Sequence, residues 1–164
     1  MNQVIEVLKN RRSIRRYKEE PISSEQIEQL KELMVLAPSA MNEQPWYFAF
    51  VQNFEKKYEL CHLSGSEEAF YGAPLIVLAF YRKAALTPVV DTTFALSNLM
   101  NGATALGLGT CFIYNIKGLF DEHEELYSSF NIPEGYVCLG GVCVGVPDEE
   151  KEAPERKQDV FIDF

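Results

Sequence analysis

The sequence predicts a single domain of mixed α and β structure, and three observations support this prediction. The chain has 164 residues, which is an ordinary size for one domain. Hydrophobic residues make up 47% of it, enough to form a core without disulfides or a metal. Segments with a helical spacing of apolar residues alternate with short apolar runs that are typical of strands, so helices and strands interleave along the chain.

The N-terminal part of the chain contains two predicted helices. Apolar residues at helical spacing predict a short amphipathic helix over 2–11. Ser23 followed by Gln26 is the pattern of a capping box, which predicts the start of a second helix. The apolar face of this helix extends to Ala37, and Pro38 ends it because proline disfavours helical geometry in the residue before it.

The rest of the chain alternates between strands and helices. The run over 75–81 is continuously apolar, which predicts a central strand. Small and apolar residues at helical spacing predict a largely buried helix over 91–106. Similar patterns predict strands over 46–51, 110–114 and 136–145, helices over 54–63 and 121–130, and loops over 39–45 and 65–72.

Charge and terminal composition narrow the classes of partner. The net charge is −9, which argues against nucleic acid as the main partner because such a chain repels phosphate backbones. The N-terminus has no basic stretch followed by an apolar run, as a signal peptide would, and no apolar run is long enough to cross a membrane. The sequence therefore predicts a soluble, cytoplasmic protein with no membrane partner.

The cysteines and histidines do not form a metal-binding pattern. There are four cysteines and two histidines, and no two cysteines form a C-x-x-C pair, so no metal site is expected. Cys138 and Cys143 lie in apolar runs, which predicts that they are small buried hydrophobic residues of an intracellular protein rather than disulfide partners. Gly140 and Gly141 lie in the same strand-like run, and their spacing does not fit a dinucleotide-binding loop.

Four of the six arginines fall between positions 11 and 16, which reverses the sign of the charge locally. Arg11, Arg12, Ser13 and Arg15 offer planar donors and a hydroxyl just after a helix, an arrangement that suits a phosphate or a carboxylate. The alternative is a basic helix end that complements the helix dipole and pairs with surface acids. The residues favour the anion site and leave the alternative open.

The segment over 37–46 is a second candidate site. Pro38 and Pro45 bound a loop that presents Ser39, Asn42 and Gln44. Amide side chains both donate and accept hydrogen bonds, which suits the edge of a heterocycle better than a simple anion. Taken alone, this segment is better explained by the end of a helix followed by the entry to a strand, and its spacing after the arginine cluster is what favours a site.

These motifs, taken in order, resemble the FMN-dependent nitroreductase family. The similarity runs through RRSIRRY (11–17), APSAMNEQPW (37–46), APLIV (73–77), ALGLGT (105–110), IPEGY (132–136) and GVP (145–147). It implies an α+β fold, a three-layer α/β/α sandwich around a mixed, mainly antiparallel sheet, in an obligate homodimer with FMN at the interface. It also implies one FMN-binding domain over 1–164. We expect its C-terminal extension, 147–164, to pack on the partner subunit, because an exposed apolar end at 160–164 would be costly.

The resemblance assigns cofactor contacts to particular residues. It implies that the FMN phosphate and ribityl chain are held by Arg11, Arg12, Ser13 and Arg15. It implies that the isoalloxazine ring packs on a loop of the other subunit, through Pro38, Ser39, Ala40, Asn42 and Gln44. It places the flavin edge beside Ile113, Tyr114 and Asn115. A basic residue near the C-terminus would add a phosphate contact, namely Arg156, with Lys157 as the alternative.

The resemblance further implies an FMN-dependent NAD(P)H oxidoreductase. In this family hydride passes through bound FMN to nitroaromatic, quinone or flavin-type acceptors by a ping-pong mechanism. No catalytic side chain is expected, since the flavin carries the chemistry. Two alternatives remain open: a non-catalytic flavin-binding or storage protein, and a relative that uses reduced flavin for other chemistry.

The segment over 65–72 departs from the family pattern. It is acidic where the family often has basic contacts to the flavin ring, and Glu67 or Glu68 close to the ring would disfavour negative charge on it. Phe70 and Tyr71 are candidates for lining the acceptor pocket, with burial in the core as the alternative.

Overall fold

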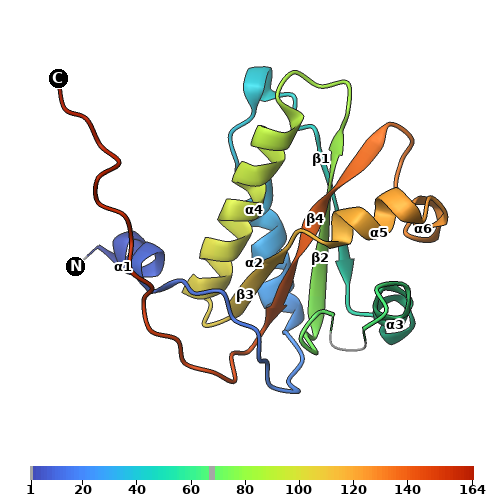
Figure 1. The fold of residues 1–164 in the computed structure, drawn as a ribbon, viewed down its shortest axis with the longest axis horizontal. Coiled ribbons are helices and arrows are strands. Elements are labelled where there is room, and N and C mark those ends of the chain that lie inside the picture. Colours follow the sequence, from blue (N-terminus) through green and yellow to red (C-terminus); the bar gives the residue numbers. More distant parts are fainter. Residues whose placement is uncertain (1, 67–68) are drawn as a thin grey trace.

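A central antiparallel sheet organises the fold (Figure 1). The computed structural model describes residues 2–66 and 69–164, so the expectation for Glu67 and Glu68 lies outside the described residues. The strands in this described part are β1 (Trp46–Val51), β2 (Leu75–Arg82), β3 (Gly109–Ile113) and β4 (Tyr136–Gly145), in the order β1-β2-β4-β3. Each neighbouring pair is antiparallel, and a parallel bridge between Ser13 and Thr110 extends the sheet beyond β3.

Helices cover both faces of the sheet, which gives the predicted three-layer sandwich. One core lies between the sheet and two helices, α2 (Ser24–Val35) and α4 (Pro88–Ala105). The other core lies on the opposite face, against α3 (Phe54–Leu63), α5 (Ile116–Glu122) and α6 (Glu125–Ser129). A further helix, α1 (Gln3–Asn10), has no buried residue and contacts α4 beyond the sheet. Every described helix is too short or too polar to cross a membrane.

Strand β4 lies between two neighbours and has a bulge in its middle. Leu139 and Val142 both face the layer of α2 and α4, although they are three residues apart. The register shifts between Ala79 and Phe80 of β2, opposite Gly140, which absorbs the extra residue with φ +141°. A Cβ atom at position 140 would lie 3.0 Å from the carbonyl oxygen of Ile113, so both the backbone angle and the space require glycine.

Replacing Gly140 with alanine is therefore expected to lower the free energy of unfolding by about 1–3 kcal/mol. Gly118 is a matched control, because it lies in α5 with open space around its Cα and an ordinary backbone angle. Gly118→Ala is expected to leave the stability unchanged or to raise it by about 0.5–1 kcal/mol. Urea unfolding of both variants without added ligand measures the difference, and equal stabilities would contradict this account of the bulge.

Most predicted elements are confirmed, and the differences have physical causes. The prediction of one helix over 121–130 is wrong, because the structure has two helices there, α5 and α6. Helix α5 begins at Ile116, since Ile116 and Phe120 bury one face against the sheet. Helix α5 ends at Glu122, and His123 has a non-helical backbone (φ −129°, ψ 77°) before α6 begins. Helix α2 ends at Val35, before Ala37, whose N–H donates to Met34 O in a tight final turn. Cys111, Cys138 and Cys143 are buried in agreement with the sequence interpretation, and Cys61 is half-buried.

The chain beyond Pro147 forms neither helix nor strand. It passes beside the arginine-rich segment and α1 and then leaves the body of the protomer (Figure 1). Its residues 152–164 are exposed, including the apolar end, where Phe161 and Ile162 are 78% and 79% exposed. An apolar end of this kind has nothing to pack against within its own protomer.

Candidate functional site

The arginine-rich segment runs in extended conformation along the outer edge of β3. The N–H of Ile14 donates to Thr110 O at 2.8 Å, and Tyr17 forms an antiparallel bridge with Pro147. Successive side chains of an extended segment point to opposite sides. Ile14 is accordingly buried while Ser13 and Arg15 are exposed, which places Arg15, Ser13 and, two residues earlier, Arg11 on one side of the segment.

Arg12 points the other way and is bound to the end of α1. Its Nη1 donates to Lys9 O at 2.7 Å and to Arg11 O at 2.9 Å. The alternative given for the arginine-rich segment, a basic helix end, therefore applies to the guanidinium of Arg12. Its Nε is buried and has no hydrogen-bond partner among the described residues. Arg12 and Ile14 line a cavity of about 650 Å³ with the turn that follows α4.

The start of the C-terminal tail fixes the backbone of the arginine-rich segment. A carboxylate oxygen of Glu149 accepts a hydrogen bond from the N–H of Arg15, which lowers the pKa of that carboxyl below its usual value. Lys151 Nζ donates to Ser13 O at 3.0 Å and lies 3.1 Å from Glu149. The tail thus occupies the backbone groups and leaves the exposed side chains of Ser13 and Arg15 facing outward.

The end of β3 lies close to the same group. The guanidinium of Arg15 lies 6.0 Å from the ring centroid of Tyr71, and Tyr71 shares a cavity of about 280 Å³ with Ile113 and Asn115. Tyr114 is 60% exposed. The structure therefore brings Arg15, Tyr71 and the residues at the end of β3 together.

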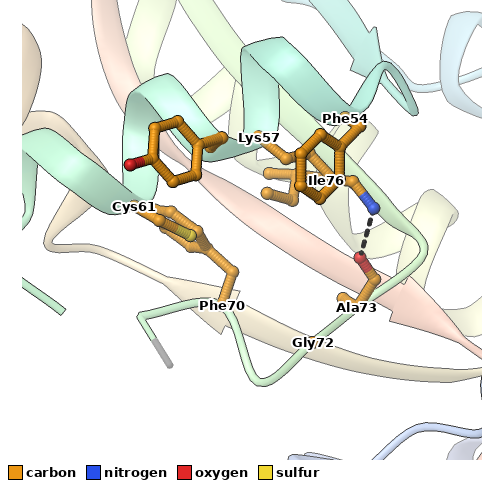
Figure 2. A pocket seen from close by; sticks show the side chains of 8 residues that line it. Phe54, Lys57, Cys61, Phe70, Gly72, Ala73 and Ile76 are labelled. Atoms are coloured by element: carbon orange, nitrogen blue, oxygen red, sulfur yellow. Dashed lines mark hydrogen bonds between the residues drawn. The ribbon is translucent and has the colours of Figure 1, made fainter. Parts of the chain in front are cut away.

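Phe70 is buried in the core, which was the alternative to its lining the acceptor pocket. It lies on the wall of this cavity and of a second one. The second cavity, of about 430 Å³, lies between α3 and the segment that leads into β2 (Figure 2). Its walls are mostly apolar, and Lys57 Nζ crosses its edge to donate to Ala73 O and Pro74 O at 3.3 Å each. Of the candidate site residues, it contains Phe70 alone.

The loop over 38–45 has an unusual backbone. Met41, Asn42 and Gln44 have φ of 51°, 55° and 47°, in the left-handed region that side chains disfavour. Such residues cost about 1–3 kcal/mol each and cluster at functional sites. The N–H of Gln44 donates to Ser39 Oγ at 3.1 Å, and Gln44 Nε2 donates to Asn42 Oδ1 at 3.2 Å. The loop contains the short helix η1 (Ala40–Asn42) and presents its polar groups at the surface.

The two groups of candidate residues lie at opposite ends of α4 (Figure 1). The loop over 38–45 contacts Asp91 in the first turn of α4, and the arginine-rich segment lies beside Thr110, which follows the last turn. A helix of 18 residues is about 27 Å long. One protomer therefore presents two separate groups of candidate residues. We call the group around Ser13 and Arg15 the first half-site and the loop over 38–45 the second half-site. Arg156 lies on the exposed tail, outside both.

The chemistry of the first half-site fits an organic phosphate with a planar ring. Arg11 and Arg15 supply charge-assisted donors, and Ser13 supplies a hydroxyl. The cavity beside Tyr71 is lined by apolar side chains together with serine hydroxyls and the amide of Asn115. Among the described residues, no three His, Cys, Asp or Glu side chains are grouped so as to hold a metal ion. Burial raises the pKa of the Cys111 thiol, so this sulfur is uncharged near neutral pH.

Several residues that hold these half-sites had no motif to mark them. Glu149 and Lys151 lie in an ordinary charged run, and Asp91 reads as one acidic residue near the start of a helix. Glu43 lies inside the motif over 37–46 but was not singled out there; it accepts from the N–H of Leu86 at 2.8 Å, across 43 residues of chain. Contacts between such distant positions follow from the tertiary fold, and only the position of Asp91 in a first turn gives a local hint.

Comparison with known proteins places these features in a family. The model of the nitroreductase family matches residues 8–67 and 61–146. The FMN reductase (NAD(P)H) of Bacillus subtilis is 30% identical over 97% of this chain and 72% of that protein. Two solved nitroreductases with bound FMN superpose on the whole chain: one from Bacteroides fragilis (TM-score 0.92, 25% identity, 100% of that chain) and one from Desulfitobacterium hafniense (TM-score 0.90, 26% identity, 99% of that chain).

Proposed function

Because this chain belongs to the nitroreductase family, we propose that it transfers hydride from NAD(P)H through bound FMN to nitroaromatic, quinone or flavin-type acceptors. It is an NAD(P)H-dependent oxidoreductase and its cofactor is FMN. The single observation that carries the site assignment is the exposed pair of Ser13 and Arg15 beside the cavity of Tyr71, Ile113 and Asn115. When bound, FMN supplies the redox chemistry, taking hydride from one substrate and passing it to the next in a ping-pong sequence.

The protein side chains bind and orient the cofactor in this proposal. Arg11, Ser13 and Arg15 bind the phosphate and the ribityl chain, since they share one side of the extended segment. Arg12 contributes indirectly, because its guanidinium binds a carbonyl group at the end of α1, just before this segment. Its buried Nε has no partner among the described residues. Ile113, Tyr114 and Asn115 lie at the flavin edge. Arg156, or Lys157 beside it, reaches the phosphate from the C-terminal tail.

We infer that the working unit is a homodimer, because each protomer presents two half-sites at opposite ends of α4 (Figure 1), a helix about 27 Å long. The second half-site would come from the partner subunit, with these loop residues against the ring: Pro38, Ser39, Ala40, Asn42 and Gln44. The outward face of α4 supports this assembly, since Val90 and Phe94 are exposed and continue toward an apolar surface shared with α1.

A visible absorption spectrum of the purified protein, with identification of the released chromophore, tests the cofactor site first. We expect a yellow protein that releases FMN at about one per chain. Anaerobic mixing with NADH or NADPH should then bleach the spectrum, and a quinone or a nitrofuran should restore it. A colourless protein that takes up no added FMN would overturn the proposal. FMN that neither nucleotide reduces would point to flavin storage instead.

A further inference from the structure

The loop over 38–45 has an unfavourable backbone, and contacts both within it and outside it hold this backbone in place. Its three left-handed residues are not glycines, and the side chain of Met41 is 87% exposed. Hydrogen bonds within the loop join Gln44 to Ser39 and Asn42, and the N–H groups of Asn42 and Glu43 donate to Ser39 O and Ala40 O. Strained backbone of this kind persists when the surrounding structure adds further restraint.

Asp91 is the buried group that does so. Its side chain is in the first turn of α4 and 2% exposed, and the N–H of Ala40 lies 3.3 Å from each carboxylate oxygen. Thr87 Oγ1 donates to the same carboxylate at 2.9 Å. The first turn of a helix favours a negative charge, and the following turns of α4 are buried in the core, so this carboxylate sits on a rigid support.

Two further contacts join the loop to the rest of the chain, one of which is the hydrogen bond from the N–H of Arg82 to Pro45 O at 2.7 Å. Glu43 accepts from the N–H of Leu86 at 2.8 Å, and its other oxygen is 3.7 Å from Arg82. Glu43 is partly exposed, so water competes for these partners. Asp91 is the side chain among these partners that is shielded from water.

We propose that Asp91 is a positioning residue, which holds the loop over 38–45 in the left-handed conformation that presents Ser39, Asn42 and Gln44 to the flavin ring. This inference rests on the proposed function. Asp91 reaches the cofactor through the backbone of Ala40, which lies between Ser39 and Met41. It acts by preorganisation, because a loop that is already in place loses less entropy when it binds.

Asp91→Asn and Asp91→Ala test the inference through FMN affinity. The amide keeps the size of the side chain but weakens acceptance from Ala40 and Thr87, and we expect the dissociation constant of FMN to rise about 10-fold, and further for alanine. The midpoint potential and the visible circular dichroism of bound FMN should also change. Val51→Ala is the matched control, since Val51 is buried at the other end of β1 from the loop. It should lower the melting temperature and leave FMN binding unchanged.

A rescue experiment separates positioning from a general loss of stability. Glycine adopts the left-handed region without cost, so Asp91→Asn combined with Met41→Gly should recover most of the lost FMN affinity. Asp91→Asn combined with Met41→Ala should not, because alanine keeps the unfavourable backbone. If both double variants behave alike, or if Asp91→Asn binds FMN like the unmodified protein, Asp91 does not position the loop. Failure of the unmodified protein to bind FMN would instead refute the proposed function.

Discussion

Arg15→Ala is expected to weaken FMN binding by about 1.5–3 kcal/mol, which is the usual loss for a hydrogen bond to a charged group. Its guanidinium is exposed on the same side as Ser13 and lies beside Tyr71, where a phosphate or the adjoining part of the flavin would reach it. Arg16 is the matched control. Its Nη2 donates to Asp148 O at 2.7 Å, on the side of the tail, so Arg16→Ala should change the affinity by less than about 0.5 kcal/mol.

Fluorescence titration of the two apoprotein variants with FMN measures this difference. Flavin fluorescence changes on binding, and the same titration at raised salt should reduce the effect of Arg15, since exposed charges are screened. Equal losses for Arg15→Ala and Arg16→Ala would mean that the local positive charge, rather than a directed contact, binds the phosphate. No loss for Arg15→Ala would contradict the assignment of this side of the segment.

Removal of residues 158–164 is expected to abolish the homodimer and, with it, tight binding of FMN. The deleted segment contains Val160, Phe161, Ile162 and Phe164, all exposed within the protomer, and their burial on a partner would supply about 1.5–3 kcal/mol for each large side chain. The rest of the fold should be unaffected, because these residues pack on nothing in their own chain.

Sedimentation velocity and the visible spectrum read out the two effects of the deletion. A control variant with Asp159→Asn and Asp163→Asn keeps the apolar side chains and should remain a dimer with FMN. A deletion variant that stays dimeric and yellow would show that the tail is dispensable and that α1 and α4 form the interface without it.

The sequence predicted those elements well whose signal is local. Ser23 and Gln26 form the expected capping box, and the helix over 54–63 has the predicted bounds. The helix over 121–130 was wrong because burial of Ile116 and Phe120, a tertiary effect, decided where α5 begins. The bulge at Gly140 could not be predicted from the sequence either, since it depends on the register between two strands far apart in the sequence.

The candidate site divides in a similar way. The resemblance assigned Ser13, Arg15 and the residues 113–115 to one cofactor; in the structure Arg15 lies beside Tyr71, which shares a cavity with Ile113 and Asn115. The alternation of side chains along the extended segment could have separated Arg12 from Arg11 and Arg15, but only once the segment was known to be extended. The left-handed loop and its restraint by Asp91 were not predictable, because no glycine marks the positive φ angles.

The separation of the two half-sites along α4 has a thermodynamic consequence. If each cofactor needs groups from two chains, then ligand binding and subunit association are one coupled equilibrium. Saturation with FMN would draw monomers into assembly, and dilution of the protein would release FMN even at constant free ligand. The fraction of the protein that carries FMN in a cell is then set by three quantities together: the affinity for FMN, the dimerisation constant and the concentration of the protein.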